Sequence, residues 1–529
     1  MRVIGGALLG LLLVGGVAGE GLAARKEGDA CAALVGFRDA RLRLEVTAAE
    51  PVPAAAPGTV RAQPYLPPLS VGLPAYCKVS GRIDDRTGAG GKRFGIGFEL
   101  ALPEAWNGRF LFQGGGGLNG SIAPPLGTTG AGDVPALARG FAVVSTDSGH
   151  TGEGFDASFM QDQRAALDFA HASVGTTTQA ALLLVQRHYG KAPEHSYIAG
   201  CSTGGRETML ATQRWPELFD GALVAAPAMR TGFSNLALAN ARARFAEAAP
   251  RDAQGKPQLA RTFSSADRAL ILRELLAQCD DLDGLADGVI ENVLACRFQP
   301  ARLQCAPGKH ESCLGAAQVT ALTEAFKAPR DAAGAPLYVD YPYDTGIVSE
   351  GQGIPGFLPA AGPDILAAVM PQAAGFDVDA QARKVRADAV QMLTDTSTWT
   401  NLGTFLGRGG KVIYFHGVSD PWFSAHDTLD YFRRAEAANG AQAWAEASRF
   451  YFVPGMGHCG GGTTRDSFDL LGPLVAWVEQ GQAPGQVLAH GAALPGQRPL
   501  CPYPTHAHYT GGDVAAPESY TCQAPASRP

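Results

Sequence analysis

A serine between glycines is the strongest candidate nucleophile in the chain. The segment 200–204, Gly-Cys-Ser-Thr-Gly, has the G-x-S-x-G form and lies between a predicted strand, 195–199, and a predicted helix. At such a turn the hydroxyl of Ser202 projects off the sheet, and the backbone N–H of Thr203 lies at a helix N-terminus, where an oxyanion is stabilised. The pattern indicates nucleophilic acyl transfer, and the alternative is a glycine-rich turn with an incidental serine.

Two residues far downstream are the partners that such a serine needs. Asp420 and His458 each follow a predicted strand, so the order along the chain is Ser, Asp, His, as in hydrolases whose nucleophile lies at a strand-to-helix turn. The histidine would act as general base, and the aspartate would hold its imidazole in the required tautomer. His150 and His416 also lie on predicted loops and remain reserve candidates for the base.

A run of four glycines is the candidate for the second half of an oxyanion hole. It occupies 114–117 and follows a predicted strand, 109–112. In this kind of fold the loop after that strand contributes a backbone N–H to the oxyanion, and glycine lets the backbone approach closely. We predict the donor at or near Gly115. A phosphate-binding loop is disfavoured because no Lys-Ser/Thr pair follows.

An aspartate-rich loop at 279–290 is the candidate metal site. Its carboxylates are hard oxygen ligands in a tight, glycine-punctuated turn, which suits Ca²⁺, although the register is not that of an EF-hand. The alternative is an acidic surface turn. The candidate ligands are the carboxylates of Asp280, Asp283 and Asp287 and the carbonyls of Leu285 and Val289.

Alternating strands and helices surround the candidate triad. Before 228 the expected strands are 94–102, 109–112, 141–144, 195–199 and 219–225, with a helix at 175–189; after 410 they are strands 411–415 and 449–453 and helices 428–438 and 467–480. This alternation predicts a parallel α/β sheet. Residues 26–90, rich in Pro and Ala, predict irregular strands that wrap a core.

The alternation breaks between 229 and 410, which is far too long for an ordinary connection. We therefore predict one α/β domain, formed by 25–228 and 411–529, with an inserted domain at 229–410. At the start of the chain, one positive charge, an apolar run and a small-residue exit predict a signal peptide over 1–24; a lone anchoring helix is the alternative. The mature protein is then expected to be secreted or periplasmic, with no membrane association.

Composition agrees with an exported globular protein. Ten cysteines, an even number with no C-x-x-C pair, favour disulfides in an oxidising compartment. The net charge is −7 and no basic cluster occurs, so nucleic acid is not an expected partner. The sequence implies no protein partner.

Together these motifs resemble the tannase/feruloyl esterase family. The matching segments are Gly-Cys-Ser-Thr-Gly-Gly at 200–205, His-Gly-x-x-Asp at 416–420, Gly-x-x-His-Cys at 455–459, the aspartate loop and the tail at 498–504. The resemblance implies an α/β-hydrolase fold with a large inserted lid domain, which coincides with the interruption at 229–410.

The resemblance also implies roles for particular residues. It implies a catalytic Ser202, Asp420 and His458, and calcium bound in the lid by the five candidate ligands. It implies a disulfide between the neighbours of the nucleophile and the histidine. The implied pairs are Cys201–Cys459, Cys31–Cys77, Cys279–Cys296, Cys305–Cys313 and Cys501–Cys522.

The expected function is a secreted serine esterase that cleaves esters of aromatic acids of the feruloyl type. Phe423 should face the acyl pocket and Trp422 should line its rim, because an aromatic wall suits a flat acyl group, although Phe423 could be ordinary core. Alternatives on the same site are a tannase or a hydrolase of mono(2-hydroxyethyl) terephthalate (MHET), a peptidase or an acyltransferase. Another is a non-catalytic, calcium-dependent binding protein.

The resemblance implies that MHET-cleaving members hold the substrate carboxylate with a lid arginine. The corresponding stretch here, 341–366, contains no Arg or Lys, although Arg383 or Arg408 could reach the pocket from elsewhere. A charge-assisted contact would be missing, so neutral-ended aromatic esters are expected to be preferred over MHET.

Overall fold

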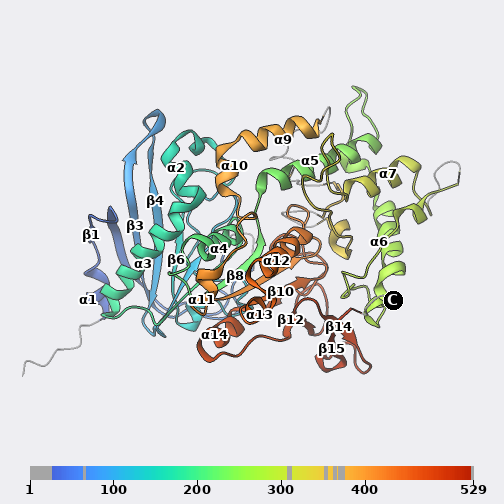
Figure 1. Ribbon diagram of the computed structural model, residues 1–529. Coiled ribbons are helices and arrows are strands. Elements are labelled where there is room, and N and C mark those ends of the chain that lie inside the picture. Colours follow the sequence, from blue (N-terminus) through green and yellow to red (C-terminus); the bar gives the residue numbers. More distant parts are fainter. Residues whose placement is uncertain are drawn as a thin grey trace, which may run out of the picture.

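A ten-stranded sheet runs through the protein in the order β1-β2-β3-β4-β6-β5-β7-β8-β9-β10 (Figure 1). The computed structural model describes residues 27–63, 67–306, 312–350, 356–361, 366 and 376–525. The predicted signal peptide, 1–24, lies outside this part of the chain. Within it, no helix has the length and apolar character that crossing a membrane requires.

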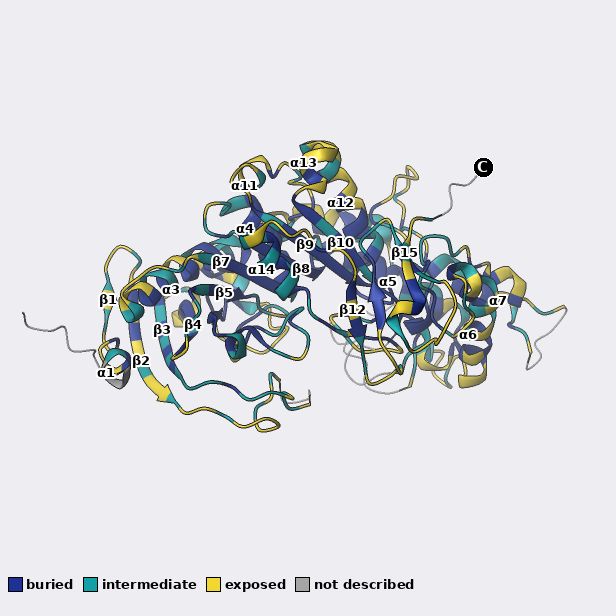
Figure 2. Cartoon of the chain, turned by 90° about the horizontal axis from the view of Figure 1, so that it is seen from below, coloured by how far each residue is buried: buried dark blue, intermediate teal, exposed yellow. Residues whose placement is uncertain are grey.

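Six parallel strands form the half of the sheet that positions the candidate site. They are β6 (Ala142–Thr146), β5 (Arg109–Gln113), β7 (His195–Ser202), β8 (Gly221–Pro227), β9 (Lys411–Gly417) and β10 (Ser448–Val453). Successive residues of these strands belong to two different cores, one on each face, which explains their continuous apolar sequences. Figure 2 shows these strands as predominantly buried.

Helices cover both faces of the parallel half. One core contains side chains of α3 (Ser173–Tyr189), α4 (Thr203–Arg214) and α12 (Ala425–Asn439), and the other contains those of α14 (Leu471–Gln480). This is the predicted α/β-hydrolase architecture. Three short α-helices also lie outside the insertion in the described part of the chain: α1 (Glu27–Ala32), α2 (Gln163–Leu167) and α13 (Ala441–Ala445).

The first part of the chain extends this sheet with antiparallel strands. They are β1 (Arg38–Asp39), β2 (Leu44–Val52), β3 (Tyr76–Thr87) and β4 (Arg93–Pro103), and β4 pairs antiparallel with β6. The prediction of irregular wrapping strands for 26–90 is therefore wrong for β2 and β3. The Pro and Ala residues that suggested irregularity are concentrated in the connection between these two strands, whereas β3 itself alternates between buried and less buried residues.

The chain between β8 and β9 forms a separate group of helices. These are α5 (Thr231–Ala248), α6 (Ser265–Cys279), α7 (Ala316–Ala325), α9 (Val378–Ala387), α10 (Ala389–Thr394) and α11 (Gly403–Gly407). Since β8 and β9 are adjacent and parallel, this segment leaves the sheet and returns to the neighbouring position. Figure 1 places α5, α6 and α7 at the end of the molecule opposite β1. Among the described residues, the core of this region receives two side chains from beyond β9, Trp422 and Phe423.

The C-terminal part differs from its prediction in one helix. Residues 467–480 were expected to be helical throughout, but β11 (Ser467–Phe468) pairs with β12 (Val487–His490), and α14 begins only at Leu471. The side chain of Asp469 accepts a hydrogen bond from the N–H of Gly472, which favours a helix start here. The remaining strands are β13 (Arg498–Leu500), β14 (His506–Tyr509) and β15 (Tyr520–Gln523).

Five disulfides link the described cysteines with the pairing that the resemblance implied. They are Cys31–Cys77, Cys201–Cys459, Cys279–Cys296, Cys305–Cys313 and Cys501–Cys522. Four of them close short segments of at most 46 residues, whereas Cys201–Cys459 joins positions 258 residues apart. That long-range bond lies at the candidate site.

Candidate active site

Ser202 stands at the sharp turn between β7 and α4. Its φ of 62° lies in the left-handed region, which is unfavourable for a non-glycine residue and typical of a strained functional turn. The turn can form because the residues two positions before and after it, Gly200 and Gly204, lack side chains: a Cβ atom at Gly204 would lie 2.7 Å from the carbonyl oxygen of Gly115. The N–H of Gly204 donates to that same oxygen at 2.9 Å, so the elbow is fixed against the glycine loop.

Asp420 follows β9 and is 2% exposed. Its Oδ1 accepts hydrogen bonds from the N–H groups of Trp422 and Phe423 at 2.8 and 3.0 Å. Its Oδ2 lies 2.6 Å from Nδ1 of His458 and 3.2 Å from Nε2 of His416. Burial alone raises the pKa of Asp420, but the two imidazoles outweigh it and hold the pKa well below its ordinary value. The carboxylate is therefore ionised at neutral pH.

The two histidines beside Asp420 differ in what they can do. His416 is fully buried and uses both ring nitrogens, since Nδ1 contacts Oγ1 of Thr428 and Nε2 contacts the carbonyl of Phe423 as well as Asp420. It is thus a support of the acid and has no ring nitrogen left for a serine. Nε2 of His458 has no hydrogen-bond partner among the described residues. His458 is the histidine that remains able to accept a proton.

The Cys201–Cys459 disulfide joins the residue before Ser202 to the residue after His458. The two Cα atoms are 6.0 Å apart. The arrangement brings the three predicted triad residues to the carboxyl ends of β7, β9 and β10, which are neighbouring parts of one sheet edge. The other reserve histidine, His150, is 2% exposed and stacks on Phe159 with ring centroids 3.5 Å apart, so it is a packed residue of the loop after β6.

The glycine loop corrects one predicted donor. The N–H of Gly115 donates to Oε2 of Glu207 at 2.8 Å, and that of Gly114 donates to the carbonyl of Ala199 at 2.9 Å. Gly115 therefore cannot offer its N–H to an oxyanion. Within the described residues, the N–H groups of Gly116 and Gly117 have no acceptor. The other predicted donor, Thr203, is the first residue of α4, and its Oγ1 donates to the carbonyl of Gly117.

Glu207 organises the glycine loop, although nothing in the local motif pointed to it. It lies on α4, one turn after Ser202, and is 1% exposed. Besides the N–H of Gly115, it accepts hydrogen bonds from Nδ2 of Asn119 and Oγ of Ser148, both at 3.0 Å. A buried carboxylate with three donors fixes the loop relative to the nucleophile helix.

Aromatic rings surround the imidazole of His458. The centroids of Phe423 and Trp422 lie 5.1 and 5.9 Å from that of His458, and these two rings stack on each other at 5.5 Å. Both predicted pocket residues thus lie beside His458. Phe155 extends the same wall, with its ring 5.7 Å from Trp422, and is 38% exposed. Phe155 was not predicted from the sequence; its one signal there is that it is an aromatic residue in the glycine-rich loop after β6, the strand next to β5.

The lid contacts this wall directly. Nε1 of Trp422 donates to Oδ1 of Asn235 on α5 at 2.8 Å, and the hydroxyl of Tyr341 donates to the carbonyl of Trp422 at 3.1 Å. The insertion and the loop after β9 that carries Asp420 (the acid loop) therefore form one side of the candidate site together.

The aspartate loop lies at the end of α6 and is held by its own backbone. Asp280 accepts from the N–H of Gly288 at 2.9 Å, Asp283 from that of Glu291 at 2.7 Å, and Asp287 from that of Val289 at 3.2 Å. Burial, and to a smaller extent the charges of neighbouring aspartates, raise the pKa of Asp283 to about 7.

This donor set has the hard-oxygen chemistry that Ca²⁺ prefers, and a cation would relieve the cost of burying the charges. One partner is already present, since Arg498 donates to Oδ2 of Asp287 at 2.7 Å. In the described parts of the chain, no three His, Cys, Asp or Glu side chains are grouped closely enough to hold a metal ion as they stand. Binding would therefore require the carboxylates to turn toward the ion.

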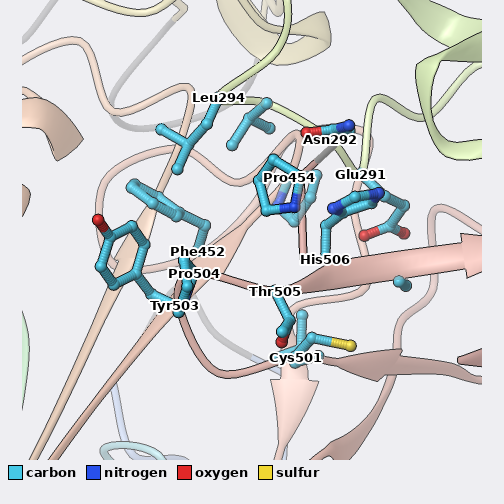
Figure 3. Close-up of a pocket in the computed structure, with 14 residues that line it drawn as sticks. Glu291, Asn292, Leu294, Phe452, Pro454, Cys501, Tyr503, Pro504, Thr505 and His506 are labelled. Atoms are coloured by element: carbon cyan, nitrogen blue, oxygen red, sulfur yellow. The ribbon is translucent and has the colours of Figure 1, made fainter. Parts of the chain in front are cut away.

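A separate pocket lies between residues 291–294, which follow this loop, and the C-terminal segment (Figure 3). Its lining includes Glu291, Phe452, Tyr503 and His506. None of the triad residues or aromatic wall residues lines it. It is thus distinct from the candidate active site.

The chain is similar in sequence to several known proteins. A family model described as "Tannase and feruloyl esterase" matches residues 77–523. The chain is 38% identical over 519 residues to mono(2-hydroxyethyl) terephthalate hydrolase of Piscinibacter sakaiensis, covering 86% of this chain and 85% of that protein. It is 30% identical over 454 residues to feruloyl esterase B of Aspergillus niger, covering 80% and 83%.

Solved structures show the same architecture. Feruloyl esterase B from Aspergillus oryzae superposes with a TM-score of 0.75 at 25% identity, covering 94% of this chain and 100% of that one. Tannin acyl hydrolase from Aspergillus niger superposes with a TM-score of 0.68 at 20% identity, covering 94% of each chain, and shows likeness of fold alone.

Proposed function

Since the chain belongs to the tannase and feruloyl esterase family and is a carboxylic ester hydrolase, we propose that it cleaves esters of aromatic acids with Ser202, His458 and Asp420 as its triad. The observation that carries the proposal is the 2.6 Å contact between His458 Nδ1 and Asp420 Oδ2, beside a disulfide that links the histidine turn to the serine turn. The ring nitrogen opposite that contact is free to accept a proton.

In the proposed reaction, His458 Nε2 takes the proton of Ser202 as its oxygen attacks the ester carbonyl. The ionised Asp420 holds Nδ1–H and stabilises the imidazolium that forms. The N–H groups of Thr203 and Gly116 receive the oxyanion. His458 then protonates the leaving alcohol. In the second half of the reaction it takes a proton from water, which attacks the acyl-enzyme carbonyl, and returns that proton to Ser202 as the acid leaves.

A labelling experiment tests the mechanism. A fluorophosphonate should modify the wild-type protein at Ser202, and Ser202→Ala should lose both labelling and ester hydrolysis while keeping its thermal midpoint. Unchanged turnover in this variant would remove the triad mechanism. A wild-type protein that is neither labelled nor active would favour the non-catalytic binding protein.

For the acyl group, we propose a flat aromatic acid with a neutral far end, such as a hydroxycinnamate. The wall of Phe423, Trp422 and Phe155 supports an aromatic acyl group. Arg230, at the start of α5, is engaged, since it pairs with Asp427 and lies over the ring of Tyr338. Arg383 and Arg408 are both exposed. None of these three arginines is therefore an evident partner for the carboxylate of a terephthalate ester.

A second candidate is MHET hydrolysis, supported by the 38% identity to the hydrolase of Piscinibacter sakaiensis. The two are separated by kcat/KM for methyl ferulate and for MHET on one preparation. We expect methyl ferulate to be the better substrate. A clear preference for MHET would show that the charge argument is wrong.

We also propose that Ca²⁺ binds in the lid loop through the carboxylates of Asp280, Asp283 and Asp287 and nearby carbonyls. The residues that would hold it belong to the insertion, next to the hairpin β14–β15, where a Cβ atom on Gly284 would lie 3.0 Å from the carbonyl oxygen of Tyr509. The ion would brace the lid against the C-terminal segment. Metal analysis of protein purified without chelator tests this proposal.

Export is proposed as well. Five disulfides require an oxidising compartment to form, which supports a secreted or periplasmic location. Fractionation of cells that express the full chain would test it, and retention in the cytoplasm would contradict it.

A further inference from the structure

A carboxylate of the insertion contacts both turns that hold the acid and the base. Asp344 lies before a short 3₁₀ turn (Thr345–Val348) and is fully buried. Its Oδ2 accepts a hydrogen bond from Oγ of Ser419 at 2.7 Å and another from the N–H of Gly455 at 2.6 Å. Ser419 directly precedes Asp420, and Gly455 begins the turn that ends at His458.

The contact is close on all sides. The N–H of Gly346 donates to Oγ of Ser419 at 2.9 Å, so this serine is bonded to the insertion twice. A Cβ atom at Gly346 would lie 2.5 Å from the carbonyl oxygen of Gly455. The two turns also touch each other, because the N–H of Ser419 donates to the carbonyl of Met456 at 3.0 Å. Any shift of Asp344 therefore displaces both turns.

The chemistry of the contact favours one shared acceptor. Gly455 has a φ of 72°, and its N–H lies in a buried turn where an unpaired donor is costly. The other oxygen of Asp344, Oδ1, has no hydrogen-bond partner among the described side chains and backbone. A single acceptor oxygen, Oδ2, thus receives both hydrogen bonds, and the side-chain oxygen of an asparagine can take its place.

We propose that Asp344 is a positioning residue of the esterase, which fixes the separation of Asp420 and His458 by binding both of their turns from the lid. This rests on the proposed roles of these two residues. It assigns the insertion a part in catalysis besides covering the substrate, because the triad geometry must be held to within a fraction of an ångström.

Four variants test the proposal. Asp344→Ala removes the acceptor and Asp344→Asn keeps it. Ser419→Ala removes one of the two bonds to Asp344, together with the bond from the N–H of Gly346. The matched control is Asp267→Ala: Asp267 is also a buried lid aspartate, and it accepts from the N–H of Ser264 at 2.9 Å and Nε2 of Gln318 at 3.2 Å, both within the lid. The measurements are the fluorophosphonate labelling rate of Ser202, kcat and KM for methyl ferulate, and the thermal midpoint.

We expect Asp344→Ala to lower kcat and the labelling rate at least about tenfold with KM little changed, the pattern of a loss confined to the transition state. Asp344→Asn should restore both rates, and Ser419→Ala should fall between. Asp267→Ala should lower the midpoint without this loss of rate. Rates in Asp344→Ala no lower than in the control would overturn the proposal.

If Asp344→Ala does not fold, Ser419→Ala decides the question, and rates equal to wild type would then overturn the proposal. Failure of the proposed function looks different. In that case the wild-type protein itself would show no labelling at Ser202.

Discussion

Replacing Glu207 by glutamine should slow the esterase more than it destabilises the fold. The carboxylate accepts from Gly115 through Oε2 and from Asn119 and Ser148 through Oε1. Glutamine has one acceptor oxygen and one NH₂ group. In either orientation, a donor of the loop meets another donor.

The magnitude follows from these contacts. A hydrogen bond to a buried charged group contributes about 1.5–3 kcal/mol, so the free energy of unfolding should fall by about 2 kcal/mol. Loss of an oxyanion donor costs about 10²–10³ in kcat. Here the donor of Gly116 is displaced and not deleted, so we expect kcat to fall about 30-fold, equivalent to about 2 kcal/mol of transition-state stabilisation.

The assay is steady-state hydrolysis of methyl ferulate, with the thermal midpoint measured in parallel. The matched control is Glu479→Gln at the opposite edge of the sheet, since Glu479 also accepts three bonds, from Nε and Nη2 of Arg109 and from the hydroxyl of Tyr197. The control should lose stability and keep kcat. If Glu207→Gln and Glu479→Gln have equal thermal midpoints and equal kcat, the assignment of Glu207 to the oxyanion loop is refuted.

Three further outcomes are expected. Chelation should lower the thermal midpoint far more than it lowers turnover below that midpoint, and indifference to both chelator and added Ca²⁺ would indicate a plain acidic turn. In the double variant Cys201→Ser/Cys459→Ser, the free energy of unfolding should fall by up to roughly 5 kcal/mol, because the bond closes so long a loop. Its turnover should fall as well, and unchanged turnover would show that the disulfide does not position His458. Burial raises the pKa of Asp147 to about 7, above its unfolded value of 3.8, so folding favours the protonated form and stability should fall as the pH rises from about 4 to about 7. In Asp147→Asn, the free energy of unfolding from urea titrations should differ less between pH 5 and pH 8 than in the wild type. An equal difference in the two proteins would contradict the prediction.

The architecture and the triad order could be predicted from local patterns. Strands of the parallel half are continuous apolar runs, and Ser202, Asp420 and His458 each follow such a run, so their common sheet edge follows from the topology alone. The prediction for the segment 26–90 failed because its Pro and Ala content dominated the pattern, whereas β3 is a regular strand that pairs with its neighbours in sequence, β2 and β4.

The supporting residues could not be predicted in the same way. Glu207 lies 92 residues from Gly115, and Asp344 lies 111 residues from Gly455. Such contacts depend on how loops from different strands meet, and no spacing rule links them. The misplacement of the oxyanion donor has the same origin: the sequence contains four adjacent glycines, and the acceptors that bind two of their N–H groups, the carbonyl of Ala199 and the carboxylate of Glu207, lie far away in the sequence.

Trp422 and Phe423 serve two purposes at once, and this constrains how the enzyme can change. They line the ring wall beside His458, and they also fill the hydrophobic core of the insertion. Truncating a buried aromatic residue costs about 3–5 kcal/mol. Variants with smaller residues at these two positions will therefore be destabilised, and a library that varies only these positions will lose them. Lid residues must be varied together with them to refill the space. New specificities in this protein are expected to arise in pairs of substitutions, one in the acid loop and one in the lid that refills the space.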